Sequence, residues 1–262
     1  MSMARPGTGA TRGVLWRELG LVLYAVQFLT RITVPAWVGH SATRLDRSTR
    51  YFPLVGALVG TIAGALYWLA SQWLPAQAAA VIAIGAGVLV TGAFHEDGLA
   101  DSCDGLGGGV DRERALEIMR DSRIGTYGTV ALVLALLLRV VALAALAPLA
   151  GLLALITAHA AGRTLVVAVI RFCHYARTEG LGKPVSTGIT RSEWLFATGS
   201  GVALVLASGI AGLFALLAAA SVAGILLWLM LRKLGGYTGD GLGAVEQCGE
   251  TAALVLLAGW TR

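Results

Sequence analysis

The chain has 262 residues, of which 56% are hydrophobic and 13% charged. Soluble domains carry about 25% charged residues, so this composition excludes an ordinary soluble domain and indicates an integral membrane protein. The formal net charge of +5 suits a chain whose basic residues lie beside anionic lipid, and we do not expect nucleic-acid binding. The three cysteines are widely spaced and form no C-x-x-C pair, which argues against a disulfide framework and against a zinc site.

The N-terminal segment, residues 1–13, is polar, glycine-rich and basic. It has neither the apolar core nor the cleavage site of a signal peptide, so it is predicted to form a flexible cytoplasmic tail. The apolar segment 19–29 is short and lies between Arg17 and Arg31. This pattern is typical of a helix that lies at the membrane interface or is only partly inserted.

Three pairs of long uncharged segments predict transmembrane hairpins. They are 52–74 with 76–94, 124–146 with 152–170, and the two halves of 194–231. A last apolar stretch, 252–260, is too short to span unless it begins near Gly243, which would bring Glu246 and Glu250 into it. The predicted fold is therefore all-α: a polytopic transmembrane bundle of about six spanning helices in three hairpins, with partly inserted N- and C-terminal helices. Residues 1–262 are expected to form a single integral membrane domain.

Charged residues mark one side of this predicted bundle. The turns near Pro75, Pro148 and Gly209 carry no charge, and only Arg139 and Arg163 of the 20 lysines and arginines lie inside a predicted span. Arg139 is the nearer of the two to the uncharged side and is expected to snorkel toward that surface. By the positive-inside rule the charged face is cytoplasmic. We therefore expect a multi-pass protein of the cell inner membrane, embedded in the lipid bilayer.

An acidic run, His95-Glu96-Asp97-Gly98-Leu99-Ala100-Asp101-Ser102-Cys103-Asp104-Gly105, directly follows one predicted span. If that helix continues, Asp97, Asp101 and Asp104 share one face at its C-terminal end, where the helix dipole is also negative. A bound cation would compensate them, and oxygen ligands favour Mg²⁺, with Mn²⁺ as the other choice, holding a phosphate-bearing substrate. The alternative to a metal site is a solvated acidic loop or a set of helix caps.

Residues 95–123 are accordingly predicted to form a cytoplasmic catalytic region, with the active site facing the cytoplasm. Within this region Asp111 is placed to cap a short amphipathic helix that ends near Arg120. Leu116 and Met119 would face the protein from that helix.

The sequence from Glu96 to Gly128 also resembles a known family. Glu96-Asp97-Gly98-Leu99-Ala100-Asp101, Asp104-Gly105, Arg112-Glu113-Arg114 and Met119-Arg120-Asp121-Ser122-Arg123-Ile124-Gly125 are similar to the cobalamin synthase family, the adenosylcobinamide-GDP ribazoletransferases. The resemblance implies a membrane transferase of a substituted phosphate group that acts late in cobalamin biosynthesis. It also implies adenosylcobinamide-GDP and α-ribazole or α-ribazole 5′-phosphate as substrates, adenosylcobalamin or its 5′-phosphate and GMP as products, and a divalent metal.

Three arginines are candidates for binding the substrate's phosphates. Arg163 lies inside a predicted span, where a charge is costly without a partner, and its guanidinium offers a bidentate fork for phosphate oxygens. Arg120 and Arg123 precede Gly125 and Gly128 at the start of another span, so phosphate could meet both side chains and close backbone N–H groups. The alternative for these two is an ordinary arginine at the membrane interface.

The last loop holds a second candidate group. Gly239-Asp240-Gly241-Leu242-Gly243 echoes part of the acidic run, so Asp240 and Glu246 are expected to join the same metal and phosphate centre. A glycine-rich turn explains the same pattern nearly as well. Arg177 and Lys183, with Gly180 and Gly182, could cover a nucleotide, although a solvated loop is the favoured interpretation.

The mechanism these residues suggest is phosphoryl transfer to an alcohol, with Glu96, Asp97, Asp101 and Asp104 as the catalytic set. Metal on Asp97, Asp101 and Asp104 would bridge pyrophosphate oxygens while a ribose hydroxyl attacks. Glu96 or Asp104 is favoured to accept the proton, and His95 is a weaker candidate. Glu96 lies about 100° around the helix from Asp97, so it is expected beside the metal face and not on it.

Two other functions remain open from the sequence. A CDP-alcohol phosphotransferase would share the Asp-Gly-x-x-Ala beginning, but Asp101 stands where that family typically has Arg, and no later aspartate pattern follows. An ion-coupled transporter would also bury Asp and Arg among glycine-broken helices, yet its carboxylates should lie near the bilayer midplane. Self-association into a homo-oligomer is left open.

Overall fold

The computed structural model describes residues 8–39, 41–177 and 188–261. These residues form an all-helical bundle, and the only extended pairing among them is a parallel bridge between Tyr175 and Tyr237. The helices in chain order are α1 (Thr8–Leu29), α2 (Ala42–Ser48), α3 (Phe52–Ala70), α4 (Ala76–Thr91), α5 (Phe94–Gly108), α6 (Arg112–Ile118), α7 (Thr126–Ala144), α8 (Pro148–Phe172), α9 (Arg191–Leu206), α10 (Gly209–Leu234) and α11 (Gly239–Trp260), with short 3₁₀ turns η1 (Ala36–Val38) and η2 (Thr49–Tyr51).

The three predicted helix pairs are present as α3–α4, α7–α8 and α9–α10, but α9, and α4 taken alone, are too short to count as membrane spans, so the predicted number of about six spans is not confirmed. Pro75 and Ala147, which adopt extended backbone angles, immediately precede α4 and α8, and α10 begins at Gly209 with φ +65°. Proline and a left-handed glycine both interrupt helical hydrogen bonding, so these turns follow from local chemistry. The protein therefore has the fold of a polytopic helical membrane protein.

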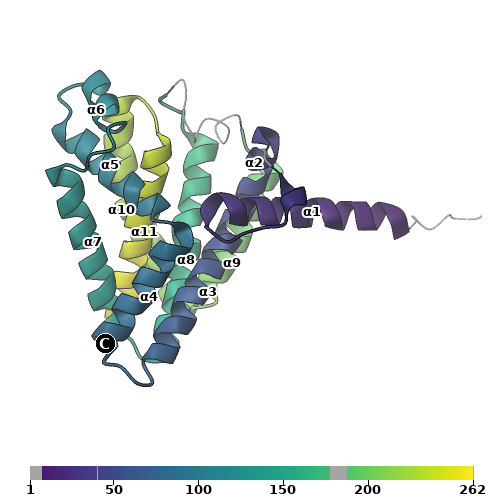
Figure 1. Cartoon of the computed structure of the whole chain (residues 1–262), viewed down its shortest axis with the longest axis horizontal. Coiled ribbons are helices and arrows are strands. Elements are labelled where there is room, and N and C mark those ends of the chain that lie inside the picture. Colours follow the sequence, from purple (N-terminus) through teal and green to yellow (C-terminus); the bar gives the residue numbers. More distant parts are fainter. Residues whose placement is uncertain (1–7, 40, 178–187, 262) are drawn as a thin grey trace, which may run out of the picture.

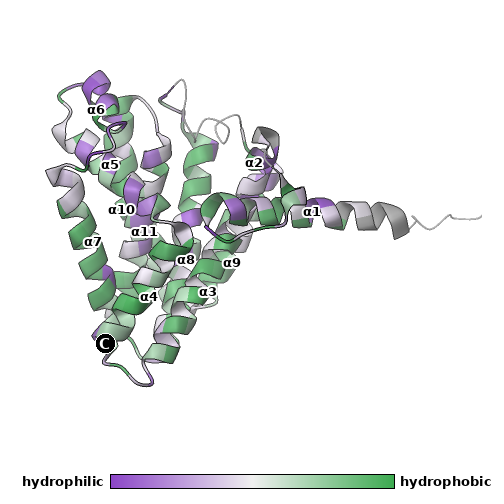
Figure 2. Cartoon of the chain, viewed as in Figure 1, coloured by the Kyte–Doolittle hydropathy of each residue, from purple (hydrophilic) through white to green (hydrophobic). Residues whose placement is uncertain are grey.

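Four segments of the described chain are long and apolar enough to cross a membrane: Arg44–Ala70, Thr126–Ala144, Pro148–Phe172 and Gly209–Leu234. α4 and α5 pass the same criterion together, although they are bent by 89°. The hydrophobic colouring covers the lower part of the bundle, and hydrophilic residues gather on α6 and α2 (Figure 2). Exposed leucines and valines on α7 and α10 face outward, as lipid contact requires.

α8 is the central helix, and α3 approaches it along a row of glycines. A Cβ on Gly60 would lie 2.6 Å from the Leu155 carbonyl oxygen, and a Cβ on Gly64 would lie 2.8 Å from Leu152 Cα. Gly56, one turn earlier, meets the His159 backbone in the same way. Small residues at every fourth position let membrane helices touch backbone to backbone. This contact fixes the depth of His159 and Arg163 in the bundle.

α1 lies across the direction of the bundle helices and extends away from them (Figure 1). Leu15, Trp16 and Leu19 are exposed on it, and Trp16 meets Trp37 edge to face with ring centroids 6.0 Å apart. This agrees with the predicted interfacial helix, because tryptophans favour the membrane–water boundary. The predicted tail over residues 1–13 is wrong in part, since α1 already begins at Thr8.

Candidate active site

The acidic run forms a helix of its own, α5, and does not extend α4. α4 ends at Thr91, and Gly92 and Ala93 follow with φ of +69° and +58°. Two successive left-handed residues break the α-helical ladder and turn the chain by 89°. The expectation of a continuous helix with its carboxylates at a negative C-terminus is therefore wrong. Glu96 and Asp97 lie in the first turn of α5, where the helix dipole favours negative charge.

Asp104 caps the next membrane helix, α7. Its Oδ2 accepts a hydrogen bond from the Gly125 N–H at 2.7 Å, and its Oδ1 accepts one from the Gly128 N–H at 2.9 Å. Both glycines lack the room for a Cβ beside this carboxylate. The backbone donors expected to bind phosphate are thus already occupied, so that part of the prediction is wrong. These two hydrogen bonds compensate the charge of the Asp104 carboxylate, so Asp104 needs no bound metal.

α5 and α11 cross with their backbones in contact. A Cβ on Gly98 would lie 2.7 Å from the Asp240 carbonyl oxygen, and a Cβ on Gly243 would lie 3.3 Å from Gly98 Cα. The crossing brings the carboxylates of Asp97, Asp101 and Asp240 near enough to repel one another electrostatically. Asp240 therefore lies beside the acidic run, as the repeated glycine motif predicts. Asp97 and Asp101 accept no side-chain hydrogen bond from the described residues.

Arg177 reaches this crossing from the segment after α8. The bridge between Tyr175 and Tyr237, with Ala176 N–H donating to the Tyr237 carbonyl at 2.8 Å, ties that segment to the loop before α11. Arg177 Nη2 then lies 2.9 Å from Asp240 Oδ2, and only 10% of its side chain is exposed. The solvated loop expected here is therefore wrong for Arg177. Gly180, Gly182 and Lys183 lie outside the described residues.

A cavity of about 360 Å³ lies on α1 and α2, and a second cavity lies at the crossing. This second cavity, of about 260 Å³, is lined by His95, Asp97, Arg163, Arg177 and Asp240 together with apolar side chains. Carboxylates and guanidinium groups from three separate parts of the chain meet in it. We call it the crossing pocket.

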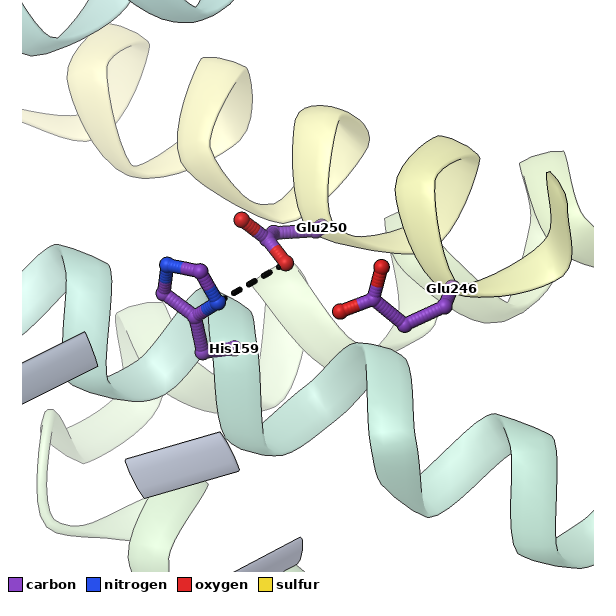
Figure 3. Close-up of side chains that lie close together, drawn as sticks. All are labelled: His159, Glu246 and Glu250. Atoms are coloured by element: carbon purple, nitrogen blue, oxygen red, sulfur yellow. Dashed lines mark ion pairs between the residues drawn. The ribbon is translucent and has the colours of Figure 1, made fainter. Parts of the chain in front are cut away.

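Beneath the crossing pocket lies an interior charge network on α5, α7, α8 and α11. Arg163 Nη1 lies 2.5 Å from Glu246 Oε1, and His159 Nδ1 lies 2.9 Å from Glu250 Oε2. Arg139 pairs with Glu250. Figure 3 shows Glu246 and Glu250 extending from α11 toward His159 on α8. At most 3% of any of these five side chains is exposed, so their charges are compensated by neighbouring side chains and not by water.

Glu96 belongs to this network and not to the face of Asp97. Its Oε1 accepts a hydrogen bond from Gln247 Nε2 at 3.1 Å and lies 3.6 Å from Arg139 Nη1. Glu96 is therefore directed away from the crossing pocket, as its angular position on the helix predicts. Arg139 is 1% exposed, so the expectation that it snorkels to the surface is wrong.

The described residues contain one group of three potential metal ligands within 4.8 Å of one another: His159, Glu246 and Glu250. Arg139 and Arg163 already pair with these two carboxylates. A cation at this position would face two guanidinium groups at close range, so the geometry favours an ion-pair network over a metal centre. Glu246 therefore belongs to the interior charge network and not to a shared metal and phosphate centre with Asp240, although both residues lie on α11.

The remaining predicted phosphate ligands lie on the surface. Arg120 is exposed after α6, and Arg123 forms an ion pair with Asp121, whose oxygen lies 2.6 Å from Arg123 Nη2. Hydrogen bonds from Arg123 lower the pKa of the Asp121 carboxyl to about 2. The structure does not bring Arg120 or Arg123 to the crossing pocket. The α6 prediction is confirmed, because Asp111 accepts the Arg114 N–H bond at 2.8 Å.

Sequence reasoning missed the interior network, and it named Arg177 only as the less favoured alternative to a solvated loop. The sequence did contain a signal. Glu246 and Glu250 are four residues apart, so they share a helix face. Arg139 and Arg163 each lie in a predicted span that contains no Asp or Glu. Opposite charges in separate membrane helices are expected to pair. The sequence does not say which helices meet, and that decides the pairing.

These features define a multi-pass membrane protein with a charged interior and a pocket of carboxylate and guanidinium groups. The family model described as cobalamin-5-phosphate synthase matches residues 21–258, and the chain belongs to this family. It is 44% identical to the adenosylcobinamide-GDP ribazoletransferase of Leptothrix cholodnii, over 94% of this chain and 96% of that one. It is 46% identical to the protein of that name from Ralstonia pickettii, over 90% of this chain and 94% of the relative. No solved structure matches the chain.

Proposed function

We propose that this chain is an adenosylcobinamide-GDP ribazoletransferase, joining adenosylcobinamide-GDP to α-ribazole or α-ribazole 5′-phosphate with release of GMP. The family match and the relatives' names support this activity over lipid head-group synthesis and over transport. The observation that carries it is the α5–α11 crossing, which gathers Asp97, Asp240 and Arg177 at one pocket. Phosphoryl transfer needs such a mixture of oxygen ligands and guanidinium donors.

The residues at the crossing offer carboxylate oxygens to a Mg²⁺ ion, with Mn²⁺ as the other choice. Among the described residues the oxygens of Asp97, Asp101 and Asp240 do not all lie within 4.8 Å of one another, so their side chains must rotate to share one ion. Asp97 and Asp101 repel each other and Asp240, and among the described residues no side-chain hydrogen bond accounts for the position of either Asp97 or Asp101. All of their donor atoms are carboxylate oxygens, which hard divalent ions prefer. We therefore assign Asp97 and Asp101 as ligands, with Asp240 in place of the capping residue Asp104. When bound, the ion would neutralise charge on the pyrophosphate oxygens.

The chain's own residues then bind and orient the reactants. Arg163 and Arg177 offer guanidinium N–H groups to phosphate oxygens, as the sequence predicts for Arg163. A ribose hydroxyl oxygen forms a bond to the phosphorus attached to cobinamide, and the bond from that phosphorus to the bridging oxygen breaks, so GMP leaves with that oxygen. The hydroxyl proton passes to a carboxylate at the crossing. Asp97 and Asp240 line the pocket, so they are better placed for this role than Glu96, which lies in the interior network.

Purified protein supplied with adenosylcobinamide-GDP and α-ribazole tests the activity. We expect equimolar GMP and a corrinoid that contains the ribazole nucleotide, and we expect both products to require added Mg²⁺. Protein that releases no GMP, or that releases GMP without consuming α-ribazole, would contradict the proposed reaction.

We also propose that the charged end of the bundle, with α6, faces the cytoplasm in an inner membrane, because lysine and arginine gather there. Single cysteines at the exposed positions Glu117 on α6 and Gln77 in the first turn of α4 test this in a variant without the native thiols. An impermeant reagent outside spheroplasts should label the cysteine at Gln77 and spare the one at Glu117. The reverse pattern would overturn the orientation.

A further inference from the structure

The crossing pocket has an aromatic wall that the charged groups do not explain. Phe28 at the end of α1 stacks on Phe52 of α3, with ring centroids 5.9 Å apart and planes inclined by 12°. Phe94, the first residue of α5, meets Phe28 edge to face at 5.7 Å. All three rings line the same cavity as Asp97 and Asp240. The pocket is therefore aromatic on one side and charged on the other.

Size limits what can enter. Sites for drug-sized ligands typically measure about 300–1,000 Å³, and the crossing pocket measures about 260 Å³. A nucleoside fits this volume, whereas a corrin macrocycle with its side chains does not. The corrinoid part of the donor must therefore stay outside the pocket.

Chemistry then separates the two nucleosides of the proposed reaction. Both bases can stack on phenylalanine by their faces, but guanine carries hydrogen-bonding groups around its edge, and those that met only apolar side chains of the pocket would be left without partners, which is costly. The base of α-ribazole is dimethylbenzimidazole, which is flat, apolar and methylated. Such a ring gains both apolar burial and ring stacking against phenylalanine.

Resting on the proposed function, we propose that the crossing pocket binds the acceptor, α-ribazole, with its benzimidazole against Phe28, Phe52 and Phe94. Its ribose then lies toward Asp97 and Asp240, which accept hydroxyl hydrogens. Arg163 also lines the pocket, and its Nε is buried without a hydrogen-bond partner among the described residues. A ribose or phosphate oxygen of the acceptor supplies the missing partner.

The wall also sets base selectivity. Phenylalanine faces reward an apolar bicyclic base and penalise a purine with exocyclic polar groups. Replacing Phe28 or Phe94 by leucine keeps apolar volume but removes the flat face, so it should weaken acceptor binding and leave donor binding intact. Phe94 is 38% exposed, so the Phe94→Leu variant disturbs little of the core.

The test measures KM for each substrate separately in wild type, Phe28→Leu, Phe94→Leu and a control, Phe214→Leu. Phe214 stacks on Trp260, with centroids 5.2 Å apart, and does not line the crossing pocket. We expect KM for α-ribazole to rise about tenfold in the first two variants, with KM for adenosylcobinamide-GDP unchanged, and no effect in the control. Unchanged KM for α-ribazole, or a rise in the donor's KM instead, would overturn the assignment.

Equilibrium dialysis of α-ribazole against wild type without the donor separates this inference from the proposed reaction. Binding that weakens in Phe28→Leu and Phe94→Leu supports the pocket even if no turnover occurs, and turnover failure then counts against the reaction alone. Binding of equal strength in all four proteins would refute the aromatic wall as the acceptor site.

Discussion

The interior charge network makes a specific prediction about stability, tested by Glu250→Gln. Glu250 is 1% exposed and pairs with Arg139, and its other oxygen lies 2.9 Å from His159 Nδ1. Removing one member of a buried ion pair typically costs about 3–5 kcal/mol, because the remaining charge is left without compensation. Arg139 retains Gln247 at 2.7 Å and Glu96 at 3.6 Å. We therefore expect the lower end, about 3 kcal/mol of unfolding free energy.

Reversible unfolding in mixed micelles measures this loss. The matched control is Glu117→Gln on α6, whose ion pair with Arg114 is 2.7 Å long but exposed, and such pairs contribute about 0.2–1 kcal/mol. The double variant Arg139→Met with Glu250→Leu should recover part of the loss, since apolar residues can replace a buried pair, whereas Glu96 then keeps only its hydrogen bond from Gln247. A cost below about 1 kcal/mol for Glu250→Gln, or a double variant less stable than each of the single variants Arg139→Met and Glu250→Leu, would refute the network as a stabilising unit.

Two glycine substitutions test how the site is held. Gly128→Ala places a methyl group against the Asp104 carboxylate, so we expect loss of the α7 cap and about 1–3 kcal/mol of stability, read from thermal unfolding. Gly98→Ala pushes on the Asp240 carbonyl at 2.7 Å, so turnover should fall at least tenfold while the helical circular dichroism is kept. Gly85→Ala, with no atom within 4 Å, is the control, and equal behaviour of all three variants would contradict both predictions.

The hairpins could be predicted from sequence because each depends on local properties. Uncharged segments of membrane length and the interrupting residues near Pro75, Pro148 and Gly209 are enough to define them. The interruption between α4 and α5 could not be predicted from such local properties. It needs Ala93 at φ +58°, a conformation that alanine adopts only when the surrounding structure imposes it.

The site itself depends on contacts between distant parts of the sequence. Arg139 and Glu250 are 111 positions apart, and Arg163 and Glu246 are 83 apart. Their residue types indicate that partners exist, but helix packing chooses the partners. Asp104 shows the same limit, because Gly125, the residue before α7 that donates to it, lies 21 residues later. The aspartates of the acidic run look alike in sequence, whereas in the structure one caps α7 and the others remain available at the crossing.

The central claim is that chemistry takes place at the α5–α11 crossing, with Asp97 as a metal ligand. Metal-dependent GMP release by purified Asp97→Asn tests it most directly, because Asn keeps the size of the side chain and removes its charge. We predict a fall in turnover of at least a hundredfold, or about 2.7 kcal/mol of barrier, with unfolding unchanged and partial rescue by raised Mg²⁺. Turnover near the wild-type rate at ordinary Mg²⁺ concentration would contradict the metal site and the placement of the reaction at the crossing.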